Sequence, residues 1–186
     1  MSVLPNPVEC WSWPLRGAVI AAALDAGMFA NAMMAPAAQE MRARGGVGIV
    51  GFELIGSWTR AEPLLDRWGD EGRRAARTTL WWDTLLFIPA YTALLGTLAG
   101  CVASHAAHRG WTGWADVAVV SLYAMGAVAL CDLVENFGLS RVLARDHRLN
   151  YPRIATTAST IKWWLVAAVV VTVATVALLF VAAPRD

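Results

Sequence analysis

Five polar side chains within otherwise apolar segments carry the groups most able to do chemistry in this chain. Asp132, Glu135 and Asn136 stand three and four residues apart in CDLVENFGL, so they share one face if that segment is helical. Asp83 opens a second apolar segment and Lys162 opens a third. Because ionisable groups are costly inside a membrane, they indicate either a working site or a structural ion pair.

Three further residues extend this set of candidates. Tyr91 follows Asp83 by two steps of four residues, with Phe87 between them, so its hydroxyl lies deeper on the same helix face. Glu53, in the loop before Asp83, is placed to approach the set from below. Asp25 stands near the middle of the first apolar segment, where a carboxylate needs a partner, water or a proton.

Three roles fit this constellation, and the sequence leaves them open. Oxygen ligands from Asp, Glu and Asn suit hard cations. Closely spaced carboxylates repel one another, so one of them could carry and pass on a proton. Lys162 could instead pair with Asp132 or Glu135 as a structural ion pair. The sequence has no Ser-His-Asp set, HExxH, P-loop or GxGxxG motif, and it identifies no catalytic residue, resident metal or cofactor.

The segments that position these residues are long enough to span a membrane. The chain has 186 residues, of which 58% are hydrophobic, and two stretches of about 20 residues, 84–103 and 163–183, carry no charge. We predict one integral membrane domain over residues 1–186, an all-α four-helix transmembrane bundle. Its helices are expected at residues 15–36, 80–102, 114–137 and 161–181.

The tryptophans divide the chain in the same way. Trp prefers the membrane–water interface, and eight of the ten lie where a helix is predicted to start. They are Trp11, Trp13, Trp81, Trp82, Trp111, Trp114, Trp163 and Trp164.

An amphipathic helix is predicted over residues 47–68, in the first loop, because apolar residues recur there at steps of three and four. Pro63 predicts a break within it and Gly69 predicts its end. The segment is expected along the bilayer surface as an interfacial helix, or folded against the bundle.

Arginine is unevenly distributed between the loops, which predicts the orientation. The first and third loops hold eleven arginines, whereas the opposite side offers only Arg16, Arg109 and Arg185. The positive-inside rule places loops one and three in the cytoplasm and both termini outside a cell (inner) membrane. Cys10 and Cys101 then share the outer side, where a disulfide could form.

Several segments resemble a set of bacterial four-helix membrane proteins. They are FELIGSWTRAEPLLDRW, WWDTLLFIPAY, CDLVENFGL and the lysine that opens the last helix. The resemblance implies no activity, but it implies that one set is formed by Glu53, Asp83, Tyr91, Asp132, Glu135, Asn136 and Lys162.

Two functional classes remain. In the first, a carboxylate-rich pocket on the cytoplasmic side binds a small ligand, a cation or a lipid head group, in a transporter or a membrane enzyme. In the second, the chain is a non-catalytic subunit of a larger membrane complex. The expected partners are the lipid bilayer and other membrane proteins or further copies of this chain. A net charge of +1 gives no attraction to nucleic acid.

Overall fold

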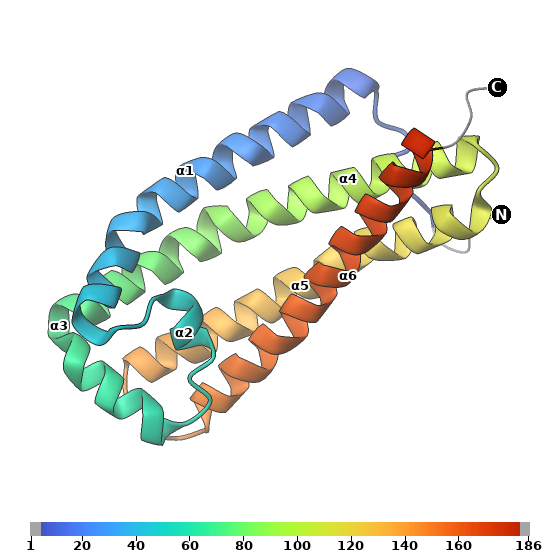
Figure 1. Ribbon diagram of the computed structural model, residues 1–186. Helices are drawn as coiled ribbons and strands as arrows, with labels where there is room; N and C mark the ends of the chain where they lie inside the picture. Colours follow the sequence, from blue (N-terminus) through green and yellow to red (C-terminus); the bar gives the residue numbers. More distant parts are fainter. Residues whose placement is uncertain (1–4, 183–186) are drawn as a thin grey trace.

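The computed structural model describes residues 5–182, and this part of the chain is all-helical (Figure 1). Four of its helical stretches are long and apolar enough to cross a membrane, as predicted, and the arrangement is compatible with a four-helix bundle. The chain is therefore built as a multi-pass membrane protein. Arg185 lies outside the described residues. The elements are α1 (Trp13–Gly45), α2 (Ile49–Glu53), α3 (Trp58–Trp82), the π-helix η1 (Asp83–Phe87), α4 (Ile88–His108), α5 (Thr112–Leu143) and α6 (Tyr151–Ala182).

The helices extend well beyond the apolar segments that predicted them. The predicted helix over 161–181 begins at Tyr151 in the structure, and the one over 80–102 is part of a continuous helical stretch that begins at Trp58. Likewise, α1 and α5 extend past residues 36 and 137. Tryptophan pairs such as Trp163 and Trp164 thus mark where a helix enters its apolar part, rather than where it starts. Interfacial aromatic residues report the depth of the membrane boundary, and nothing requires the helix to stop there.

The long helices pack mainly against their neighbours along the chain. α1 packs against α3 and α4, α4 packs against α5, and α5 packs against α6. The α1–α3 connection and the α5–α6 connection lie at one end of the molecule (Figure 1). The start of α1 and the end of α6 lie at the other end.

A compact helical cap, formed by residues 41–82 and 139–155, covers the end that holds these two connections. Its centre is Trp68, which has no exposed surface and packs against Phe52, Leu65 and Met41. The indole Nε1 of Trp68 donates a hydrogen bond of 3.0 Å to the carbonyl oxygen of Met41. Gly72 leaves room for this side chain, because a Cβ at Gly72 would fall 2.6 Å from the Cβ of Trp68.

The segment predicted as helical over residues 47–68 is divided in the structure, but not at Pro63, where the break was predicted. α2 ends at Glu53 and α3 begins at Trp58, and Pro63 lies inside α3 without a break. The chain bends instead at Gly69, whose φ of 58° and ψ of −160° suit a residue without a side chain. The apolar face of the segment is buried against protein in the cap, while its position at the membrane surface stays a prediction.

We expect Trp68→Ala to destabilise the cap strongly. Removing a fully buried Trp typically costs about 3–5 kcal/mol, because the cavity left behind does not close. The matched control is Trp81→Ala, since Trp81 is 59% exposed. The thermal midpoint of the purified protein in detergent is expected to fall clearly for Trp68→Ala and little for Trp81→Ala. Equal midpoints for the two variants would contradict the packing described.

Candidate functional site

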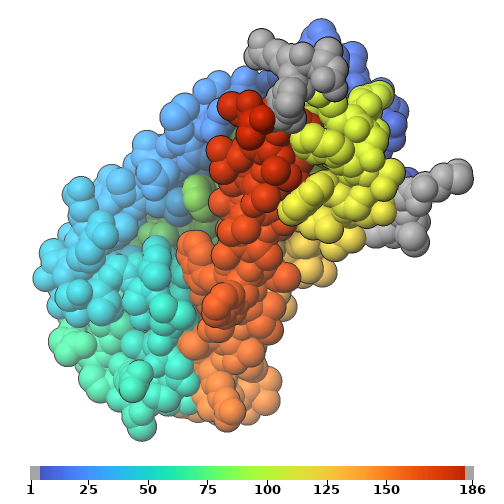
Figure 2. Space-filling model, turned by 45° about the vertical axis from the view of Figure 1, so that its right-hand side comes forward, coloured from blue at the N-terminus to red at the C-terminus, as the bar shows by residue number. Residues whose placement is uncertain are grey.

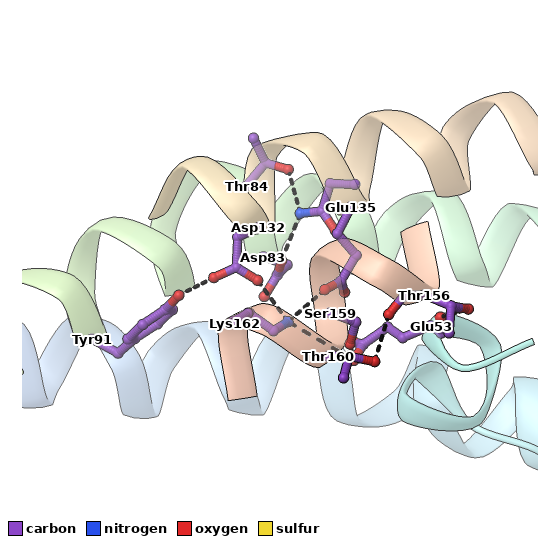
Figure 3. Close-up of polar contacts among 11 residues, drawn as sticks. Glu53, Asp83, Thr84, Tyr91, Asp132, Glu135, Thr156, Ser159, Thr160 and Lys162 are labelled. Carbon is purple, nitrogen blue, oxygen red and sulfur yellow. Dashed lines mark hydrogen bonds and ion pairs between the residues drawn. The ribbon is translucent and has the colours of Figure 1, made fainter. Parts of the chain in front are cut away.

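Lys162 is the centre of a buried polar cluster at the junction between the cap and the apolar parts of the helices (Figure 3). Its Nζ lies 2.7 Å from Asp132 Oδ1 and 2.8 Å from Glu135 Oε2. All three residues are at least nine-tenths buried. The structure thus joins α5 and α6 through one amine and two carboxylates.

Three further hydrogen bonds tie α4 and η1 to the same face of α5. The hydroxyl of Tyr91 donates to Oδ2 of Asp132, the oxygen that Lys162 does not bind. The side-chain amide of Asn136 donates to Asp83 Oδ2 at 2.6 Å and to Thr84 Oγ1 at 2.9 Å. Each polar residue on this face of α5 therefore has a partner on another helix.

Pro89 explains the local backbone around Asp83. Proline lacks an N–H and its ring clashes with the carbonyl four residues earlier, so it disturbs the regular hydrogen bonds of the helix around it. The helix widens into η1, where the N–H of Ile88 bonds to the carbonyl oxygen of Asp83, five residues earlier. Such π-turns are frequent at functional sites. This one carries Asp83 and Thr84, the two groups that Asn136 reaches.

Glu53, at the end of α2, differs from the rest because its backbone is held by short hydrogen bonds, whereas its carboxyl contacts another carboxyl, that of Glu135, and lies farther from Lys162. Thr156 Oγ1 donates to the Glu53 carbonyl oxygen at 2.8 Å and accepts from the N–H of Gly56 at 3.0 Å. The Glu53 carboxylate, in a residue only 8% exposed, lies 3.5 Å from Ser159 Oγ and 3.9 Å from Lys162 Nζ. Burial raises the pKa of this carboxyl, although the charge of Lys162 opposes the rise.

A cavity of about 400 Å³ opens beside this cluster. Five of the candidate residues line it, whereas Glu135 and Asn136 lie behind its wall. Its polar lining is Asn31, Glu53, Thr79, Asp83, Tyr91, Asp132 and Lys162, and its apolar lining is Met34, Ile49, Val50, Phe87, Leu95, Trp163 and Val166.

The charges of the cluster do not balance. Four carboxyl groups, from Glu53, Asp83, Asp132 and Glu135, share the single amine of Lys162. Over residues 5–182, no group of three or more His, Cys, Asp or Glu side chains is arranged to hold a metal ion. The amine of Lys162 lies between carboxylates that would otherwise face one another. The arrangement is suited to taking up a proton or a positively charged organic group.

Asp25 does not join this cluster, because its side chain is exposed on the outer face of α1. The sequence interpretation also omitted Thr84, Thr156 and Ser159, which contact the cluster. A signal for Ser159 was present, since it precedes Lys162 by three residues and therefore shares its helix face. The cysteines, Cys10 and Cys101 among them, are free in the structure.

The raised pKa of Glu53 predicts a pH dependence of stability. The folded protein holds the Glu53 proton more tightly than the unfolded chain, so this residue destabilises the fold as pH rises above its ordinary pKa of 4.5. Glu53→Gln, which cannot ionise, should gain thermal midpoint relative to the parent protein as pH rises above 4.5. Glu9→Gln, which removes an exposed carboxylate, is the control. A constant difference across this range would contradict the assignment.

No protein-family model matches this chain. Neither a curated protein nor a solved structure matches it. The functional interpretation therefore depends on the geometry of the cavity and of the polar cluster beside it.

Proposed function

We propose that this membrane protein binds a small organic ligand with a positively charged group in the cavity beside Lys162. The excess of carboxylates gives the site its preference for positive charge. Phe87, Tyr91 and Trp163 add aromatic rings to the lining, and aromatic faces attract ammonium groups. Transport of the ligand and a membrane-embedded reaction on it are both compatible with such a site.

The observation that carries the proposal is the Glu53 carboxylate. A buried polar group normally has good hydrogen-bond partners, and one without them is costly. Glu53 lines the cavity and is more than nine-tenths buried, and its carboxyl contacts another carboxyl, that of Glu135, while its one cationic neighbour, Lys162, lies 3.9 Å away. A ligand ammonium in the cavity would give this carboxylate a close partner of opposite charge.

The other candidate residues take supporting roles in this proposal. Asp132 and Asp83 also line the cavity and are the further acceptors for the ligand. Glu135, one helical turn from Asp132 and bound to Lys162, compensates the charge of that amine. Asn136 positions Asp83, and Tyr91 positions Asp132.

A pair of probes of equal shape tests the proposal. Phenyltrimethylammonium carries the charge, and tert-butylbenzene is its neutral isostere. The protein, released gently from its own membrane, should bind only the charged probe in native mass spectrometry, and should lose it on Glu53→Gln. Asp116→Asn, which removes a carboxylate on α5 away from the cavity lining, should leave binding unchanged. Equal retention of both probes, or of the cation by Glu53→Gln, would reject the proposal.

A second function, as a subunit of a larger membrane complex, is favoured by one observation on α1. The carboxylate of Asp25 is exposed among Leu24, Met28 and Phe29, which are 45%, 64% and 53% exposed. A carboxylate facing lipid is unfavourable, whereas a neighbouring protein could supply its partner. Stoichiometric partner chains in the same spectra, with no bound cation, would support this function over the first.

We also propose an orientation, with the cap in the cytoplasm and the start of α1 and the end of α6 outside a cell membrane. The arginine bias between the loops supports it. The end of α2 and the first turns of α3 then lie near the inner membrane boundary, as an interfacial segment within the cap.

Thiol labelling of intact cells checks this orientation. Cys10 is exposed, so a membrane-impermeant maleimide should label it from outside. A cysteine replacing Arg148, in the α5–α6 connection, should react only after the cells are opened, with Cys10 replaced by Ser in that variant. The opposite pattern would reverse the orientation.

A further inference from the structure

The cavity beside Lys162 changes character along its length. Its polar end is formed by Glu53, Asp132 and Lys162, near the cap. Leu95 lies twelve residues after Asp83, so at 1.5 Å per residue the lining extends about 18 Å along the helix axis. Val166, one turn beyond Lys162, lines the same cavity. The lining therefore passes from charged to apolar within the membrane-spanning part of the bundle.

The helices on either side of this cavity are separated. α1 packs against α3, η1 and α4, while α6 packs against α5, α4 and α2. Met34 of α1 and Val166 of α6 both line the cavity and are partly exposed. Figure 2 shows the surface hollowed between α1 and α6, with atoms of α4 at the bottom of the depression. Between the apolar parts of two membrane helices, such an opening faces the bilayer.

We infer that the ligand is an amphiphile with a cationic head and an apolar chain, which enters sideways from the bilayer between α1 and α6. This inference rests on the proposed function. The head lies against Glu53 and Asp132, and the chain lies along Met34, Leu95 and Val166. An amphiphile fits because the polar and apolar ends of the cavity match its two parts, and because its natural location is the membrane into which the cavity opens.

The test compares a long-chain and a short-chain cation on the protein in lipid nanodiscs. Dodecyltrimethylammonium and phenyltrimethylammonium share the quaternary ammonium group and differ in the chain. Val166→Trp narrows the opening, and Val170→Trp, one turn further along α6 at a position that does not line the cavity, is the matched control. The long-chain cation also partitions into the bilayer itself, and this background is the same for both variants.

The expected result is that Val166→Trp weakens binding of the dodecyl cation by about tenfold, the effect of losing burial of roughly two methylene groups. Val170→Trp should leave binding of both cations unchanged, and Val166→Trp should weaken binding of the short cation clearly less than binding of the dodecyl cation. A dodecyl cation with a photoreactive group at its chain end should label residues of α1, α4 or α6 that line the cavity.

The possible failures are distinguishable. If the short cation binds and depends on Glu53, but the dodecyl cation is insensitive to Val166→Trp and labels no lining residue, the amphiphile inference is wrong and the proposed function stands. If neither cation binds the parent protein, the proposed function itself fails and the inference fails with it.

Discussion

The constraint on which this structure depends is a single amine held among several carboxyl groups at the edge of the membrane. A buried ion pair gains Coulomb energy only if its geometry compensates for the lost hydration, and removing one partner leaves an uncompensated charge. Lys162 meets this condition by contacting Asp132 and Glu135 at hydrogen-bonding distances. Because these groups come from α5 and α6, the ion pairs also fix how the two helices face each other.

The cap explains how the cluster can exist at this depth. Glu53 reaches Lys162 only because α2 is fastened to α6, through the two bonds of Thr156. The rest of the cap packs around Trp68 and covers the cytoplasm-facing side of the cluster in the proposed orientation. Apolar burial in the cap thus stabilises a position for Glu53 that its own electrostatics oppose.

The residues of the polar cluster could be predicted from the sequence more readily than the bounds of the helices around it. Steps of three and four residues identified the shared face of Asp132, Glu135 and Asn136, because helix geometry alone determines it. The length of α6 before Lys162 was missed, since polar residues outside the bilayer give no hydropathy signal. The division of the first-loop helix lies at residues 54–57, whereas it was predicted at Pro63. It depends on the packing of α2 against α6, a contact between segments about a hundred residues apart.

The same long-range packing decides which carboxylates are able to meet a ligand. Glu135 and Asp132 are one turn apart on α5, yet only Asp132 lines the cavity. Glu135 does not line the cavity, so its charge acts on a ligand through its contacts with Lys162 and Glu53 rather than directly. Asp83, although bound by Asn136, lines the cavity because the π-turn before Pro89 widens the helix there. The site therefore combines carboxylates that can touch a ligand with one that compensates Lys162. A bound cation then adds a partner for Glu53 without requiring the ion pairs that hold α5 to α6 to break.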